Sequence, residues 1–549
     1  MRVLIFHGYL LRGTGSNVYN AELGAALVRA GHEVHLVCQE RDPFALPWVD
    51  ARADWDEGAL AVEARREVVR ATVYRPDIGG LLPVYVADRY DGVVARPFPA
   101  LSDEELDRYL AANVAAVREV AARARPDVAL ANHLVMGPAV LARALDAAVG
   151  YAVKIHGSAL EYTVKPHPRF RPYAVAGLAR ASGILVGSRH TAESLWAELS
   201  DPSVSERTRL GPPGVDVERF APQSPAAASA TLASLRARLA ASAPSPPAQP
   251  ALAAAPPAPA PPVPAASPPA PAPPTPALPA PAPPADAAPS SFARDVGEAV
   301  AALDTIAPGD RLVVFVGKLI ASKGVELLLA AFPLVLAREP RARLLIVGFG
   351  AFRGGLEALA QHLAAGDLDA AARTRAEDGR ELPELVAFFA RLDSAHRDAY
   401  RAAAARLPER VAWAGRLEHD EVADLLPAAE AMAVTSTFPE AFGMVAAEAA
   451  ACGALPVVAD HSGLGEVART LAAVVPPPAR PWLTFEVGPD AVAQLADALS
   501  GWLQAPADLR AQTRAAIVEE TRARYSWDGV ARTVIAAAGG ELGDLPRPA

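Results

Sequence analysis

The chain has 549 residues, enough for two or more domains that each bury a hydrophobic core. Its formal net charge of −10, with no long basic run, argues against a general nucleic-acid-binding protein. No stretch of about 18 apolar residues lacks charge or proline, and residues 1–6 are too short for a secretory signal. We therefore expect a soluble cytoplasmic protein, for which peripheral membrane contact stays open. Cys38 and Cys452 are expected to be buried thiols, not a disulfide.

The first 40 residues predict a βαβ unit with a glycine-containing loop between its first strand and its helix. The expected elements are a strand at Val3–Phe6, a loop from Gly8 to Ser16, a helix at Val18–Ala30 and a strand at Glu33–Cys38. Such a turn lets backbone N–H groups approach a phosphate. Gly13-Thr14-Gly15 partly matches the dinucleotide fingerprint, with Val18 at the third glycine and Glu40 where a ribose-binding acid could lie. A structural turn, a sugar-nucleotide loop and an NAD(P) site all remain open here.

Polar residues follow several later strands of this half. A helix is expected at Asp103–Ala124, and three strands are expected after it. The strand 128–131 is followed by Asn132-His133, the strand 151–155 by His156, and the strand 183–186 by Gly187-Ser188. Open parallel sheets bind ligands at the carboxyl ends of their strands. We predict one N-terminal domain over residues 1–221, closed by the segment Gly211–Phe220.

The composition changes sharply after this domain. Residues 241–290 are nearly all Ala, Pro and Ser, and Asp286 carries their only charge. Such a segment lacks the branched apolar residues of a core, and its prolines favour an extended chain. We predict a disordered Ala/Pro-rich linker or insertion over residues 222–296.

The second half again alternates strands and helices and predicts a domain over residues 297–505. The expected strands are 311–316, 342–347, 411–414, 431–435 and 455–459. Residues 354–410 are helical and longer than a crossover needs, so they predict an inserted helical hairpin. Helices over 506–549 complete the chain. The fold class is therefore α/β, with two doubly wound Rossmann-like domains facing across a cleft.

Two loops of the second half carry charged residues at the ends of strands. Lys318 and Lys323 lie on one loop between a strand and a helix, where both amines could reach a diphosphate. Glu440 precedes the helix that Gly443 opens, and Glu448 lies about two turns into it. Together these carboxylates could hold two ends of a polar ligand whose anionic part lies at the helix N-terminus. Without other information, such lysines and glutamates are more often solvated surface groups.

The run from Phe438 to Gly453, with its Glu-x7-Glu spacing, resembles the signature of the retaining GT-B glycosyltransferases of family 4, or glycosyl transferases group 1. Residues 317–324 are similar to that family's G-[RK]-x4-K-G loop, and His156-Gly157 to its H-G-x-D segment. The resemblance covers residues 1–221 and 308–535. It implies a hexosyltransferase-type reaction that moves a sugar from a nucleoside-diphosphate donor to an acceptor hydroxyl, with retention. It implies no metal or other cofactor.

The resemblance also implies roles for particular residues. It implies the catalytic residues His156, Lys318, Lys323 and Glu440, and the donor-binding residues Gly15, Arg416, Leu417, Phe442, Gly443, Met444, Val445 and Glu448. Three departures stand out. Lys318 replaces the Arg of many members. Ala159 stands where an acid is often found, although Glu161 follows two residues later. The segment Ser462–Glu466 differs from the family's G-G-x-P-E.

Some features of the sequence have no role in the predicted reaction. Asp367-Leu368-Asp369 is a D-x-D sequence inside the helical insertion and is expected to be solvated, so no metal site is predicted. The basic loop Lys165–Arg171 could meet an anionic acceptor or a lipid headgroup, although a solvated loop is favoured. The acceptor itself, whether a glycan, glycolipid or small metabolite, is not readable. The alternative functions are an NAD(P)-linked enzyme using Gly13–Gly15 and Glu40, or a donor-binding protein without turnover.

Overall fold

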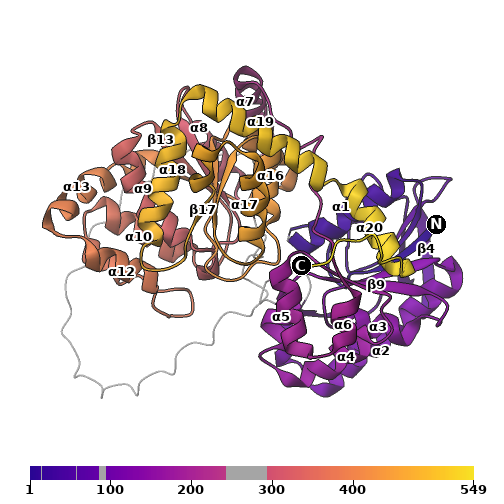
Figure 1. The fold of residues 1–549 in the computed structure, drawn as a ribbon. Helices are drawn as coiled ribbons and strands as arrows, with labels where there is room; N and C mark the ends of the chain where they lie inside the picture. Colours follow the sequence, from indigo (N-terminus) through magenta and orange to yellow (C-terminus); the bar gives the residue numbers. More distant parts are fainter. Residues whose placement is uncertain (14, 57, 86–93, 243–293, 549) are drawn as a thin grey trace, which may run out of the picture.

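The computed structural model describes residues 1–13, 15–56, 58–85, 94–242 and 294–548, which form two α/β domains (Figure 1). Each domain is built on a sheet of parallel strands with helices on its faces. This confirms the predicted fold class. Most of the predicted Ala/Pro-rich linker, residues 243–293, lies outside the described residues.

The N-terminal domain contains a nine-stranded sheet in the order β11-β10-β9-β8-β1-β2-β5-β3-β4. All neighbouring strands are parallel except β3 and β4, which are antiparallel. Successive side chains of β1 enter different cores, Val3 and Ile5 on one face and Leu4 and Phe6 on the other. The strands are β1 (Arg2–Phe6), β2 (Glu33–Val37), β3 (Ala51–Asp56), β4 (Ala59–Ala64), β5 (Ala71–Arg75), β8 (Val128–Asn132), β9 (Gly150–Ile155), β10 (Gly183–Val186) and β11 (Thr208–Leu210). The helices are α1 (Gly15–Arg29), α2 (Asp103–Ala124), α3 (Gly137–Ala144), α4 (Arg171–Leu178), α5 (Arg189–Leu199) and α6 (Pro202–Arg207).

No strand was predicted between residues 41 and 100, yet the described residues of this range form five. Strands β3, β4 and β5 extend the main sheet, and β6 (Leu81–Val84) and β7 (Val94–Pro97) form a separate parallel pair. Strand β4 is almost entirely exposed, so it shows none of the alternation of apolar and polar residues that marks a half-buried strand.

The C-terminal domain contains a six-stranded, all-parallel sheet in the order β14-β13-β12-β15-β16-β17. Its strands are β12 (Arg311–Val316), β13 (Ala342–Val347), β14 (Val411–Gly415), β15 (Ala431–Val434), β16 (Leu455–Ala459) and β17 (Thr484–Phe485). Its helices include α9 (Val325–Arg338), α15 (His419–Leu425), α16 (Met444–Ala451), α17 (Ser462–Val474) and α18 (Ala491–Gln504). The strand order reverses between β12 and β15, and ligands of open α/β sheets bind at such a point.

Part of the predicted linker is folded. Residues Pro225–Ser242 form helix α7, which packs against α8 (Val296–Asp304) and α15. Leu235 and Leu239 of α7 lie in the core of the C-terminal domain. The prediction of a linker starting at residue 222 was therefore wrong for residues 225–242. Ala-rich sequence has high helix propensity, and leucines spaced by four residues form a buried stripe.

The insertion at residues 354–410 is more than a hairpin of two helices. It contains α10 (Arg353–Ala364), α11 (Leu368–Ala372), α12 (Pro383–Arg391), α13 (Ser394–Ala404) and α14 (Leu407–Arg410). A tight turn between α11 and α12 is closed by an antiparallel bridge between Arg375 and Glu381.

The last two helices connect the domains. Helix α19 (Ala507–Arg524) contacts α16 and α17, whereas α20 (Trp527–Gly539) contacts β8, β9, β10 and α1, as the yellow ribbon in Figure 1 shows. Trp527, Val530 and Val534 complete one core of the N-terminal domain. At the crossing point, the Val215 N–H donates to the Tyr525 carbonyl (2.7 Å). Among the described helices, none is both long and apolar enough to cross a membrane.

Candidate functional site

Two loops at the carboxyl edge of the C-terminal sheet form one unit. We call residues 317–324, after β12, the lysine loop, and residues 435–443, after β15, the glutamate loop. The Thr435 hydroxyl donates to the Lys323 carbonyl (2.8 Å), and the Thr437 N–H donates to the Ser322 carbonyl (3.0 Å). Gly324 has φ +64°, and a Cβ there would lie 2.0 Å from the Thr435 carbonyl oxygen, so only glycine fits.

The contact between these loops brings Lys323 and Glu440 together. The Lys323 ammonium pairs with Glu440 Oε1, and the Ser436 hydroxyl donates to the same oxygen (2.7 Å). Burial alone would raise the pKa of Glu440, but the charge of Lys323 and the donated hydrogen bonds outweigh it and lower that pKa. Glu440 is therefore ionised at neutral pH. Lys318 lies half-buried on the same lysine loop.

Helix α16 begins directly after the glutamate loop and carries Glu448. Gly443 precedes the helix with φ +132°, and Glu448 is 4% exposed. Glu448 Oε1 lies 2.9 Å from Nε2 of His419, the first residue of α15. Burial lowers the pKa of His419, but the Glu448 carboxylate more than compensates, and the net shift is upward. His419 was not predicted as a site residue, because the sequence indicated only that a helix begins there.

The predicted Arg416 and Leu417 lie in the segment between β14 and α15, just before His419. Arg416 pairs with Glu418 (2.9 Å), and Leu417 is buried. Of the remaining predicted donor-binding residues, Phe442 packs edge-on against Tyr525 with ring centroids 5.2 Å apart, and Met444 and Val445 are partly buried at the start of α16.

His156 lies at the end of β9 in the N-terminal domain. Its Nε2 is 2.8 Å from Asn132 Oδ1, while the Asn132 amide donates to Asn20 Oδ1 (2.7 Å), so Oδ1 must accept and Nε2 carries the proton. This leaves Nδ1 as an acceptor. Burial, together with His133 and Lys154, holds the pKa of His156 well below its usual value, and the ring is neutral at pH 7. The orienting role of Asn132 was also missed.

The site loops of the two domains touch. A Cβ at Gly187 would lie 2.6 Å from the Ala441 carbonyl oxygen, and one at Gly15 would lie 3.9 Å from Met444 Sδ. Rings of Tyr162 and Phe438 stack with centroids 5.2 Å apart. Among the predicted site residues, Gly15 of the N-terminal domain thus lies beside Met444 of the C-terminal domain.

Glu466 forms the most direct polar contact across this interface. Its carboxylate accepts hydrogen bonds from the N–H groups of Arg189 (2.9 Å) and His190 (3.0 Å), at the N-terminus of α5. A carboxylate is favourable at a helix N-terminus. Glu466 belongs to the segment Ser462–Glu466 that departs from the family pattern, and nothing in the sequence indicated this contact.

Other predicted features have structural partners. Glu40, the candidate ribose acid, accepts hydrogen bonds from the N–H groups of Leu11, Arg41 and Asp42 and pairs with Arg12. The carboxylate is therefore already bound by groups of the chain. Asp367 caps α11, and Asp369 lies 3.4 Å from Arg397.

The basic loop is also partly engaged. Its Arg169 donates to three backbone carbonyls and pairs with Asp103 (3.3 Å). Glu161 binds Lys165 (2.8 Å) and accepts from the Ser194 hydroxyl (2.6 Å). In the described ranges, no three His, Cys, Asp or Glu side chains are grouped so that they could hold a metal ion.

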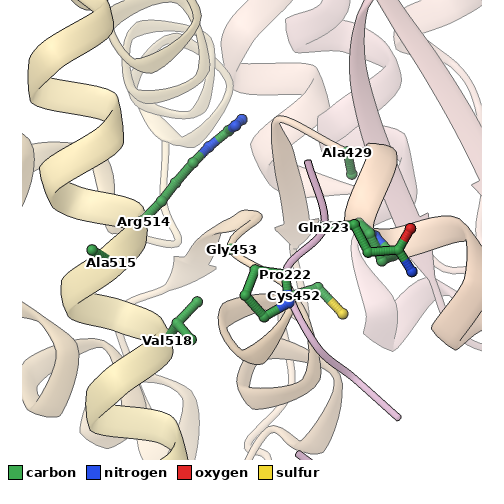
Figure 2. Close-up of a pocket in the computed structure, with 9 residues that line it drawn as sticks. Pro222, Gln223, Ala429, Cys452, Gly453, Arg514, Ala515 and Val518 are labelled. Carbon is green, nitrogen blue, oxygen red and sulfur yellow. The ribbon is translucent and has the colours of Figure 1, made fainter. Parts of the chain in front are cut away.

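A cavity of about 140 Å³ lies away from these loops, beside the segment that leaves the N-terminal domain (Figure 2). Pro222, Cys452, Gly453, Arg514 and Val518 contribute to its lining. Ligand pockets are typically about 300–1,000 Å³. The cavity is therefore too small for a nucleotide-sized ligand.

Models of glycosyltransferase families match both halves of the chain. The family model described as "Glycosyl transferases group 1" matches residues 304–368 and 393–520, and the model described as "Glycosyl transferase 4-like domain" matches residues 14–204. No curated protein sequence gives a significant match.

Similar solved structures share the fold at low sequence identity. A sucrose-phosphate synthase from Thermosynechococcus elongatus superposes with a TM-score of 0.55 at 18% identity, over 98% of both chains. Anabaena HepE in complex with UDP and glucose gives 0.53 at 14% identity, over 98% of this chain and 99% of that one. The catalytic domain of starch synthase IV from Arabidopsis thaliana, bound to ADP and acarbose, gives 0.55 at 13% identity, over 98% of both chains.

Proposed function

The chain belongs to the group 1 glycosyltransferases, and from that premise we propose that it transfers a sugar from a nucleoside-diphosphate donor to an acceptor hydroxyl with retention of configuration. One observation carries the proposal most strongly. Lys323, Glu440 and the start of α16 lie together at the carboxyl edge of the C-terminal sheet, against the loops of the N-terminal domain. Anabaena HepE in complex with UDP and starch synthase IV bound to ADP share the fold, which supports a nucleotide-linked donor.

The leaving group is a diphosphate, and the chain offers cations and N–H donors where its charge would develop. Lys318, Lys323 and the first N–H groups of α16, after Gly443, would neutralise it. Lys323 would turn from Glu440 toward the phosphates when the donor binds. This frees the Glu440 carboxylate to accept a hydrogen bond from a donor-sugar hydroxyl.

Other residues would orient the donor. Glu448, held by His419, would accept hydrogen bonds from the ribose hydroxyls, and Arg416 and Leu417 would lie beside the base. His156 is neutral, so its Nδ1 would accept from a sugar hydroxyl and would not pair with a phosphate. Gly15 would provide a backbone donor. Holding both reactants in one geometry supplies much of the rate enhancement in such a reaction.

The reaction we propose balances without a protein nucleophile. The bond between the anomeric carbon and the diphosphate oxygen breaks as the acceptor oxygen bonds to that carbon on the same face. The acceptor's proton moves to the departing phosphate oxygen. The transition state has oxocarbenium character, which the ionised Glu440 would favour.

A donor screen tests the proposal. Thermal shift with UDP-, GDP- and ADP-sugars would identify the nucleotide, since a ligand that binds only the folded state raises the melting temperature. Release of nucleoside diphosphate with that donor and NMR of the product anomer would then test transfer and retention. The absence of any stabilising donor, or an inverted anomer, would contradict the proposal.

A further inference from the structure

One segment of the C-terminal domain lies outside the match to the group 1 model but touches the lysine loop. The model leaves out residues 369–392, which contain the end of α11, a tight turn and α12. Glu377, at the tip of that turn, places its two carboxylate oxygens 2.9 and 3.2 Å from the backbone nitrogen of Ala321. A segment outside the family match thus contacts the loop that carries both lysines.

The turn presents Glu377 from a fixed base. The Ala376 N–H donates to the Arg380 carbonyl (3.0 Å), and Arg375 and Glu381 form an antiparallel bridge just outside. Ala376 and Leu382 are buried in the domain core on either side of the tip. Packing and the bridge therefore fix the backbone that carries Glu377, and its exposed side chain is held by the contact with Ala321.

Ala321 begins the short 3-10 turn Ala321–Lys323, whose third residue is Lys323. The residue before it, Ile320, has no side chain that can accept the first N–H of the turn. Glu377 supplies that acceptor from 56 residues away, and hydrogen bonds to a charged acceptor are stronger than neutral ones.

The opposite side of the same turn is held by the glutamate loop. Thr437 donates to the Ser322 carbonyl, and Thr435 donates to the Lys323 carbonyl. The turn is therefore clamped between the glutamate loop, which belongs to the family signature, and the Glu377 turn, which does not. Releasing either side lets the backbone under Lys323 move.

We propose that Glu377 is a positioning residue, which fixes the backbone of the 3-10 turn so that the Lys323 amine is aimed at the donor diphosphate. This inference rests on the proposed function. A carboxylate so close to an anionic ligand would by its charge alone weaken donor binding, and the hydrogen bond to Ala321 gives it the opposite, favourable effect.

The Glu377→Ala, Glu377→Gln and Glu381→Ala variants separate these effects. Glutamine keeps an acceptor for the Ala321 N–H and loses the charge, and alanine loses both. Glu381→Ala removes the same charge from the same turn without touching the lysine loop, because Glu381 pairs with the exposed Arg375. We expect about a tenfold fall in kcat/KM for Glu377→Ala, and values within about threefold of wild type for the other two.

Hydrogen exchange provides a second measurement, which does not depend on glycosyl transfer. Hydrogen exchange of the peptide covering residues 317–324, measured without donor, should be faster in Glu377→Ala and close to wild type in Glu377→Gln and Glu381→Ala. Calorimetric titration with UDP, GDP and ADP measures the nucleotide affinity of each variant. If transfer were never detected, exchange would still decide the positioning role independently of the proposed function.

Two results would overturn the inference. Unchanged exchange and unchanged kinetics in Glu377→Ala would show that the hydrogen bond to Ala321 does not hold the turn. Tighter nucleotide binding by both Glu377→Ala and Glu377→Gln, with unchanged exchange, would show that the carboxylate acts only as a repelling charge.

Discussion

Replacing Lys323 with alanine tests the centre of the proposed site most directly. The substitution removes a cation from the leaving diphosphate, and loss of one such stabilising group typically costs about 10²–10³ in kcat, or about 3–4 kcal/mol. The cost in stability is much smaller. The Lys323 and Glu440 side chains are 30% and 27% exposed, and a solvent-screened pair of this kind contributes about 1 kcal/mol or less.

The same variant should change the pH dependence. With Lys323 present, the pKa of Glu440 is lowered; without it, burial remains and raises that pKa. Because Glu440 must be ionised to accept a sugar hydroxyl, the acid limb of the kcat/KM profile should move to higher pH.

The assay is release of nucleoside diphosphate from about pH 3.5 to 9, with a melting curve for each variant. Arg338→Ala is the control, since Arg338 also pairs with a carboxylate, Asp497, but lies outside the proposed site. The reasoning is refuted if Lys323→Ala keeps kcat within about threefold of wild type and shows the same acid limb.

Three further variants test other parts of the structure. Glu448→Gln loses the charge that pairs with His419 and should weaken nucleoside diphosphate binding by about tenfold in calorimetry, with a smaller change in kcat; equal affinity would exclude a ribose-binding role. Burial raises the pKa of Glu326 to about 8, so the folded state keeps a proton that the unfolded chain loses near its ordinary pKa. The free energy of unfolding should therefore fall by about 1.4 kcal/mol per pH unit from that ordinary pKa up to about 8, and in chemical denaturation at several pH values Glu326→Gln should lack this contribution. Deleting residues 525–549 removes the buried Trp527, Val530 and Val534, at about 1.5–3 kcal/mol per side chain, and should give an aggregated or unfolded N-terminal domain in size-exclusion chromatography and circular dichroism; a folded monomer would contradict the assignment of α20 to that core.

The sequence predicted the elements whose signals are local. Strands β12, β13 and β16 have the predicted bounds because each contains a run of at least four apolar residues, as buried parallel strands do. Helix α2 also has its predicted bounds, and Ser102 with Glu105 forms a capping box at its start. By contrast, α7 lies in a segment whose composition resembles that of the linker, and its packing against the C-terminal domain decides its structure.

The site could be predicted only as far as its motifs reached. The motifs indicated Lys323 and Glu440, which are 117 residues apart in sequence, but gave no sign that they pair with each other. The contacts that His419, Asn132, Glu466 and Glu377 make were missed for a common reason. Each of these residues acts through a contact between loops of separate elements, which depends on the assembled fold and leaves no periodicity or spacing in the chain.

The crossing at Val215 and Tyr525 has a mechanical consequence. Two stretches of polypeptide pass between the domains at one place, and Val215 and Ser526 are bridged in parallel there. A single tether would let the lobes swivel in any direction, but two joined tethers leave mainly an opening and closing rotation about the line through them. Proteolytic nicking of the first stretch would then leave both halves attached through the second, while removing the restraint on swivelling that keeps Gly157 beside Ala441.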